Sequence, residues 1–213
     1  MSPREPISRA PWPPLVLALL LVGLYAWQAS RPDSVEVQVA FGFTPASLPE
    51  GWRGLISALF VHGSWTHVLF NSAFALAFGA AVSRQLGVDV LGALVLLAFF
   101  VLCGGLGNAG FALVHPYGES PVVGASGAVA GLMAAASRLL ERRPGLAPFT
   151  SPTVVGMAAA WIAVNVLVGV FGLSPGLGSA GLPIAWEAHL AGYAAGLFLI
   201  GPFDAVIRRL HAT

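Results

Sequence analysis

The feature that most constrains this chain is its series of long apolar runs without a charged side chain. Only 9% of the 213 residues are charged and 57% are hydrophobic, and the mean hydropathy is +0.82. A soluble protein of this size has too little interior to hide so much apolar surface from water. The sequence therefore predicts an integral membrane protein. A net charge of +1 gives no indication of a nucleic-acid partner.

The lengths of the runs predict six membrane-spanning helices. A helix needs about 20 residues to cross about 30 Å of hydrocarbon. Residues 1–213 are accordingly predicted to form one all-α membrane domain, a six-helix bundle with spans at about 14–30, 64–83, 91–114, 122–140, 153–173 and 185–207. The connection 31–63 is too long for a simple loop, and its prolines, charges and aromatic rings are typical of a segment lying in the membrane interface.

The arginines predict the orientation, because the chain contains no lysine. Only Arg31 and Arg53 fall on one side of the six-span arrangement. The other eight fall on the opposite side: Arg4, Arg9, Arg84, Arg138, Arg142, Arg143, Arg208 and Arg209. By the positive-inside rule both termini are expected in the cytoplasm and 31–63 outside.

The first apolar run follows two arginines, as in a signal peptide, but no small-x-small cleavage site follows it. We therefore expect it to be retained as a span. The Ala-, Gly- and Pro-rich composition, arginine as the only strong base, and the lack of a transit peptide favour a bacterial plasma membrane.

Three polar residues are predicted to lie at one depth. Spans two, four and six all enter the membrane from the external face, and His67, Ser126 and His189 each follow the predicted start of a span by about four residues, or about 6 Å. Polar groups inside a membrane are costly and usually face the bundle interior or a wet cavity. We expect the three residues to converge just below the outer surface.

Ser126 and His189 are the pair that nucleophilic acyl transfer requires. The imidazole takes the hydroxyl proton during attack and returns it to the leaving amine. Glu187 lies about 200° around the helix from His189 and Asp204 four turns deeper, so the sequence predicts a catalytic dyad without a carboxylate. Tyr193 follows His189 by four residues, and its ring is expected to support the imidazole.

His67 and Asn71 are also four residues apart and form one polar stripe on the second span. Together with the Ser126 amide they are candidate oxyanion donors, each worth roughly 3 kcal/mol. His62 precedes that span and is expected to hold the interfacial segment in place. Each residue also has a structural interpretation, since serine, histidine and asparagine in membrane helices often only join neighbouring helices.

Small residues surround the serine in the string GASG at 124–127. Gly124 and Gly127 flank Ser126. The pairs Gly127/Gly131 and Gly192/Gly196 are small-xxx-small patterns that favour close helix packing. Packing of these pairs would bring spans four and six close enough for the serine and the histidine to meet.

These motifs together resemble the rhomboid family of intramembrane serine proteases. The resemblance covers roughly residues 40–205 and rests on WR at 52–53, HGSWTHVLFN at 62–71, GASG at 124–127 and AHLAGYAAG at 188–196, in that order. It implies that Ser126 is the nucleophile, His189 the base, and His67, Asn71 and the Ser126 amide the oxyanion hole. It also implies hydrolysis of peptide bonds in or beside the transmembrane helices of substrate proteins, without metal or cofactor, and substrate entry from the lipid past spans two and five.

Two positions depart from the family pattern. Many members have an aromatic residue four positions after the serine, where this chain has Ala130, and many bacterial members have a glutamate where this chain has Ser83. The main alternative is a catalytically inactive rhomboid-like protein that binds transmembrane helices. A proton or metal transporter would require buried carboxylates in the middle of a span, and the sequence has none. A zinc protease would require a helix with the motif His-Glu-x-x-His, which is also absent from the sequence.

Overall fold

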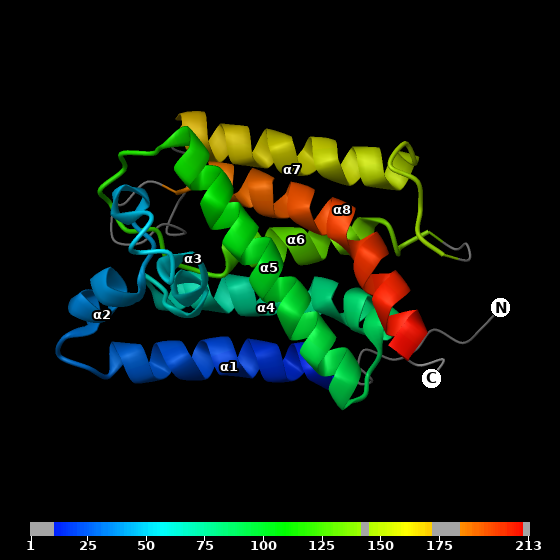
Figure 1. Cartoon of the computed structure of the whole chain (residues 1–213), viewed down its shortest axis with the longest axis horizontal. Coiled ribbons are helices and arrows are strands. Elements are labelled where there is room, and N and C mark those ends of the chain that lie inside the picture. The colour runs from blue at the N-terminus through cyan, green and yellow to red at the C-terminus, as the bar shows by residue number, and fades with distance from the viewer. Residues whose placement is uncertain (1–10, 142–144, 172–183, 211–213) are drawn as a thin grey trace.

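The computed structural model describes residues 11–141, 145–171 and 184–210. Within these ranges the regular structure is helical, apart from one isolated bridge between Phe43 and Val122. The elements are α1 (Trp12–Ala29), α2 (Ser34–Phe41), η2 (Pro45–Ser47), α3 (Gly54–Ser57), η3 (Ala58–Phe60), α4 (Trp65–Leu86), α5 (Val90–Val114), α6 (Ser126–Ser137), α7 (Pro152–Phe171) and α8 (Trp186–Leu210) (Figure 1).

Five helices, α1, α4, α5, α7 and α8, are long and apolar enough to cross a membrane. This confirms the prediction of an all-helical membrane protein. Their described ends lie within three residues of the predicted spans 14–30, 64–83, 91–114, 153–173 and 185–207. The predicted end of the fifth span, at 173, lies outside the described residues.

The predicted fourth span is wrong in its extent. The sequence favoured 122–140, whereas α6 is a helix of 12 residues that starts at Ser126. Val122 is extended because its backbone exchanges two hydrogen bonds with Phe43, and Gly124, at φ +111°, cannot continue into a helix. The α6 helix is thus a short central element rather than a full span.

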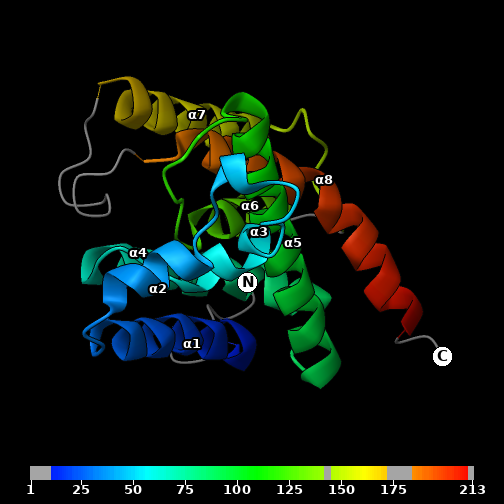
Figure 2. The same cartoon turned by 60° about the vertical axis from the view of Figure 1, so that its left-hand side comes forward.

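The α6 helix lies in the interior of the bundle. It packs against α4, α5, α7 and α8, and ten of its residues are buried, the exceptions being Ser126 and Met133. Figures 1 and 2 show α6 between α4 and α8, with α1 and α7 on opposite sides of the molecule. A helix surrounded in this way needs small side chains, which explains its alanines and glycines.

Four glycines lie where the backbones of α6 and α8 approach each other, and we call Gly127, Gly131, Gly192 and Gly196 the glycine seam. A Cβ on Gly192 would fall on the carbonyl oxygen of Gly127, and a Cβ on Gly196 on that of Gly131. The two helices therefore touch backbone to backbone, as the small-residue pattern indicated.

The segment 31–63, expected as an interfacial connection, folds into α2, η2, α3 and η3. It is joined to the chain before α6 by the Phe43–Val122 bridge and by a hydrogen bond of 2.8 Å from the Gly124 amide to the Ala58 carbonyl. The Asn108 side chain of α5 also donates to the Leu55 carbonyl, at 2.9 Å. These bonds fix the chain that leads into Ser126.

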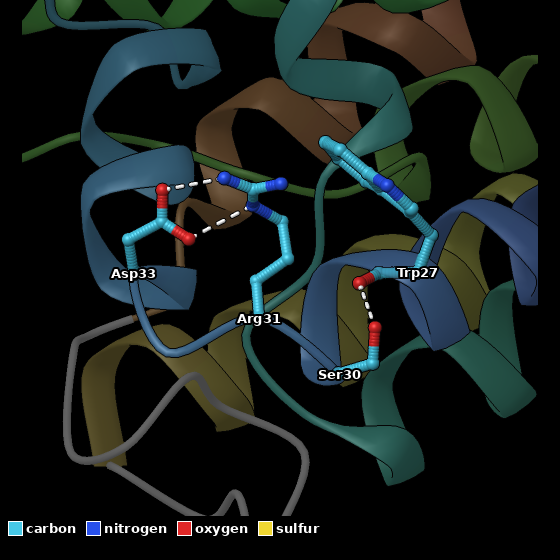
Figure 3. A network of polar contacts seen from close by, with 4 residues as sticks. All are labelled: Trp27, Ser30, Arg31 and Asp33. Atoms are coloured by element: carbon cyan, nitrogen blue, oxygen red, sulfur yellow. Dashed lines mark hydrogen bonds and ion pairs between the residues drawn. The ribbon is translucent and has the colours of Figure 1, made fainter.

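The turn between α1 and α2 is closed by a small polar network (Figure 3). Ser30 Oγ donates to the Trp27 carbonyl at 2.8 Å, and the Arg31 guanidinium makes two bonds to the Asp33 carboxylate, at 2.8 and 2.9 Å. Arg31 also lies 5.2 Å from the centre of the Trp27 ring. The arginine lowers the pKa of Asp33, chiefly through these hydrogen bonds. The pair is exposed, so it shapes the turn more than it stabilises the fold.

Two side-chain hydrogen bonds join helices at the end of the bundle opposite the segment 31–63. Trp12 at the start of α1 donates to the Val88 carbonyl between α4 and α5, and Gln85 of α4 donates to Asp204 of α8, at 2.7 Å. The start of α1 and the end of α8 therefore lie at the same end of the molecule (Figure 1). Which side of the membrane this end faces stays a prediction.

Candidate active site

Ser126 is the first residue of α6, not a residue four positions inside its helix as the sequence suggested. The first amides of an α-helix have no acceptor within the helix, and the helix dipole makes this end electropositive. Ser126 therefore lies at the end of α6 where the backbone N–H groups point out of the helix, in a place that suits a developing negative charge.

His189 is the fourth residue of α8, and its imidazole faces Ser126 across the glycine seam. His189 Nε2 lies 2.7 Å from Ser126 Oγ. This is the hydrogen bond that a nucleophile and its general base must make. Both side chains are partly exposed, so the pair is accessible from the cavity described below.

His67 and Asn71 of α4 lie on the other side of the serine. Ser64 accepts a bond of 3.1 Å from the His67 amide and so caps α4, which fixes the start of the helix two residues before His67. A Cβ on Gly124 would fall on the His67 ring and would lie 3.5 Å from Asn71 Nδ2. Only glycine leaves room for both side chains to approach the chain just before Ser126.

The Asn71 amide nitrogen is buried and has no hydrogen-bond partner within the described parts of the chain. A buried donor without a partner costs roughly 1–3 kcal/mol. Such an unpaired donor beside a serine at a helix start is free to bind an oxygen of a ligand.

Gly127 follows Ser126 and belongs to the glycine seam, where a Cβ on it would approach the Ala188 carbonyl at 3.2 Å.

A cavity of about 620 Å³ opens above these residues and holds Ser126, His189, His67 and Asn71 in its lining. Its walls come from α4 and from α7, through the apolar side chains Phe70, Phe74, Trp161, Val164 and Val168. His115 and Glu187, which are joined at 2.8 Å, also line the cavity. The site is thus a polar floor below apolar walls.

Neither Glu187 nor Asp204, the two carboxylates that share α8 with His189, contacts its ring. Glu187 bonds His115, while Asp204 bonds Gln85 and Arg208 at the far end of the bundle. Among the described residues no group of three or more histidine, cysteine, aspartate or glutamate side chains could hold a metal ion.

His62 is joined to α1 through its backbone, and its expected role in holding the interfacial segment stays a prediction. Gln28 of α1 donates from Nε2 to the His62 carbonyl at 2.8 Å and accepts from its amide at 3.2 Å. The ring is fully buried, with its centroid 5.1 Å from that of His67 and 6.3 Å from that of Tyr25. Burial, with a smaller contribution from His67, lowers the pKa of His62 to about 3.

The aromatic ring beside His189 comes from a residue that the sequence analysis did not select. Trp161 of α7 lies with its ring centroid 6.0 Å from that of His189, at an interplanar angle of 39°. Tyr193 instead packs against Ala130 and Ala134 of α6. Its expected role toward the imidazole stays a prediction.

Asn165 is the second residue that sequence reasoning missed. Its Oδ1 lies 2.8 Å from His189 Nδ1, on the side of the ring away from Ser126. Asn165 is a buried amide within an apolar helix, four residues after Trp161. The one signal in the sequence is that Asn165 is a polar side chain inside an apolar span, and it has no other candidate at helical spacing.

The fold and these motifs define a class, the helical membrane proteins in which a serine and a histidine from two helices meet in a cavity. Comparison with known proteins identifies the family. The family model described as Rhomboid domain matches residues 49–203, and the chain belongs to the rhomboid family.

Several curated proteins are similar to the chain. RHOMBOID-like protein 5 of Arabidopsis thaliana is 31% identical over 151 residues, 70% of this chain and 43% of that protein. RHOMBOID-like protein 4 of the same plant is 30% identical over 198 residues, 88% of this chain and 44% of that protein. Rhomboid protease GlpG of Klebsiella pneumoniae is 26% identical over 182 residues, 85% of this chain and 59% of that protein. The chain thus spans less than half the length of the two plant relatives.

Proposed function

We propose that this chain is an intramembrane serine endopeptidase, formed by residues 1–213 as one rhomboid-like membrane domain. The observation that carries the proposal is the 2.7 Å contact between Ser126 Oγ and His189 Nε2 on the floor of the cavity. Family membership and the match to a relative named a rhomboid protease support it.

The proposed reaction starts with attack of Ser126 Oγ on the carbonyl carbon of a peptide bond, while His189 Nε2 takes the hydroxyl proton. The negative charge that develops on the carbonyl oxygen is met by the Ser126 amide, by Asn71 Nδ2 and by the His67 ring. One such donor is typically worth about 3 kcal/mol in the transition state. His189 then gives its proton to the leaving amine, which departs with the C-terminal fragment.

The second half removes the acyl group from the serine. A water molecule attacks the ester carbon, His189 takes one proton from it, and the same donors hold the oxyanion. Collapse of this intermediate releases the new carboxyl group and returns the proton to Ser126. Water reaches this depth because the floor of the cavity is polar and the cavity opens outward.

The proposed substrates are transmembrane helices of other membrane proteins. An intact helix keeps its carbonyl oxygens hydrogen-bonded, so it must unwind at the cut, which favours small and helix-destabilising residues there. Entry between α4 and α7 is supported by the apolar walls they give the cavity. It is supported also by the low burial of α7, in whose span only 11% of the residues are buried, against 28–39% in the other four spans.

The proposed setting is a bacterial plasma membrane, with both termini in the cytoplasm and the cavity facing outward. The eight-to-two distribution of arginines supports this orientation.

A fluorophosphonate probe tests the proposal without knowledge of the substrate. We expect the detergent-solubilised protein to be labelled, and labelling to be lost in Ser126→Ala and in His189→Ala. Ser137→Ala is the matched control, because Ser137 is a buried serine at the other end of α6 whose hydroxyl bonds the Ala134 carbonyl. An unlabelled wild-type protein that still binds transmembrane peptides would favour the inactive, helix-binding alternative.

A further inference from the structure

The feature that the dyad does not account for is the amide of Asn165 on α7. This side chain is 3% exposed, and both of its polar atoms are bonded. Its Nδ2 donates to the Trp161 carbonyl at 2.8 Å, and its Oδ1 lies 2.8 Å from His189 Nδ1. An asparagine side chain offers two donors on nitrogen and an acceptor on oxygen.

The first of these bonds decides which way the amide points. A backbone carbonyl accepts and cannot donate, so the Asn165 nitrogen must face the Trp161 carbonyl and the oxygen must face His189. An amide oxygen in turn can only accept. His189 Nδ1 must therefore carry a hydrogen and donate it to Asn165.

The tautomer of the histidine follows. A neutral imidazole has one protonated and one unprotonated nitrogen. With the proton on Nδ1, the nitrogen that faces Ser126 is the bare one, and it accepts the hydroxyl hydrogen. This is the form a general base must have before the attack.

We propose that Asn165 is a positioning residue for His189, which holds the imidazole in the tautomer and orientation that activate Ser126. The inference rests on the proposed serine peptidase function and extends the dyad to a Ser–His–Asn arrangement across α6, α8 and α7. The amide fills, without a charge, the place of the orienting group in a serine triad. An uncharged group is the less costly choice at this depth, because a carboxylate buried in an apolar helix is strongly penalised.

The same helix supplies the ring that packs beside the imidazole, since Trp161 lies one turn before Asn165. Ala130 is too small to reach His189 from the serine's own helix. The hydrogen bond to Nδ1 of His189 and the aromatic ring beside the imidazole therefore both come from α7. A purely structural role for Asn165, joining α7 to α8, would use the same hydrogen bond, but its removal would leave the maximal rate of the reaction with the probe unchanged.

The test compares wild type with Asn165→Leu, which keeps the side-chain size and removes the acceptor. We expect the maximal rate of fluorophosphonate inactivation to fall 10- to 100-fold with the half-saturating probe concentration unchanged within twofold. This fall in rate is smaller than the factor of about 10²–10⁴ that a general base contributes. The imidazole is still present in Asn165→Leu, and only its orientation is lost.

Nitrogen-15 NMR of histidine-labelled protein reports the tautomer directly, and the chain has only five histidines. We expect His189 to carry its hydrogen on Nδ1 in the wild type and to become a mixture of tautomers in Asn165→Leu. The signal is assigned by its absence from His189→Gln. A wild-type hydrogen on Nε2 would overturn the inference, even if Asn165→Leu did not fold.

An Asn165→Leu protein that reacts at the wild-type rate, or that changes only the half-saturating concentration or the melting temperature, would also overturn it. Failure of the proposed function itself looks different. In that case the wild type is not labelled at Ser126 at all, while the tautomer measurement still reports whether Asn165 positions the ring.

Discussion

The two helices that meet His189 from opposite sides are held in place in different ways. On the serine side, α6 and α8 touch through the glycine seam, where added Cβ atoms would fall on backbone carbonyls. On the other side, α7 contacts α8 through side chains, notably Asn165 and Trp161, and only 11% of the residues in its span are buried.

This difference separates two requirements of the candidate site. The distance between Ser126 and His189 is set by backbone contact, which no side-chain rotation can relax. The orientation of the imidazole is set by side chains on the most exposed span. We expect changes in the seam to damage the fold and the site together, and changes on α7 to affect the chemistry while leaving the fold intact.

The largest effect is expected from an added methyl group in the seam. Gly196→Ala puts a Cβ on the Gly131 carbonyl, so the helices must separate. Overpacking of this kind costs about 1–3 kcal/mol or more, and a shift of about 1 Å between reacting groups can cost 100-fold in rate. We expect a clear fall in melting temperature and at least a 100-fold fall in fluorophosphonate labelling.

Gly156→Ala on α7 is the matched control, because its added Cβ would have no atom within 4 Å apart from the neighbouring backbone of its own helix. Alanine is the better helix former by roughly 0.5–1 kcal/mol, so this variant should be at least as stable as wild type. Equal melting temperatures and equal labelling in the two variants would contradict the distinction between the glycine seam and α7.

The next largest effect is expected at the oxyanion donors. Asn71→Ala removes the unpaired amide beside Gly124, and loss of one such donor typically lowers the rate by about 10²–10³. The maximal rate of inactivation by the probe should fall by this factor, with little change in melting temperature. Ser72→Ala is the control, since the neighbouring Ser72 faces α1 and bonds the Ala18 carbonyl; equal losses in both variants would contradict the assignment.

A smaller effect is expected at Trp161, whose ring packs beside the imidazole without a hydrogen bond to it. Trp161→Ala should lower the labelling rate about tenfold, of the order of the 0.5–1.5 kcal/mol that aromatic pairs contribute beyond burial. Trp161→Phe should retain most of the rate. Ile162→Ala on the exposed face of α7 serves as control, and a loss there as large as in Trp161→Ala would show that the ring has no specific role.

The last prediction concerns stability rather than labelling rate, and it rests on His62, whose buried ring lies beside His67 and Tyr25 and away from both contacts of α8. His62 has its pKa lowered from 6.5 to about 3 when folded, so between these values the unfolded chain binds a proton that the folded chain does not. The His62 contribution is therefore complete above about pH 6.5 and is lost as the pH falls toward 3.

We expect the melting temperature to fall between pH 6.5 and pH 4.5, and to fall less in His62→Phe than in the wild type. Thermal unfolding in detergent at a fixed scan rate measures both. The same pH slope in the two proteins would contradict a folded-state pKa far below 6.5.

Much of the fold was predictable, because apolar runs without charge determine where spans lie. The start of α6 was not, since the apolar residues before Ser126 look like helix and their extended conformation depends on Phe43, 79 positions earlier in the chain. The interfacial segment was recognised from its composition, but its packing against residues 115–125 depends on backbone bonds that side-chain patterns do not encode.

The candidate site shows the same division. Ser126, His189, His67 and Asn71 stand out because they occur in motifs with helical spacing. Asn165 lies alone among apolar residues, and its contact with His189 depends on which face of α7 packs against α8. The spacing of residues within one helix does not determine that face.

The most direct test of the account is a structure of the protein inactivated by a small fluorophosphonate. We predict a covalent bond from phosphorus to Ser126 Oγ, with the phosphoryl oxygen within hydrogen-bond distance of the Ser126 amide and Asn71 Nδ2, and His189 still bonded to Asn165. An adduct on any other residue, or a phosphoryl oxygen directed away from Asn71, would contradict it.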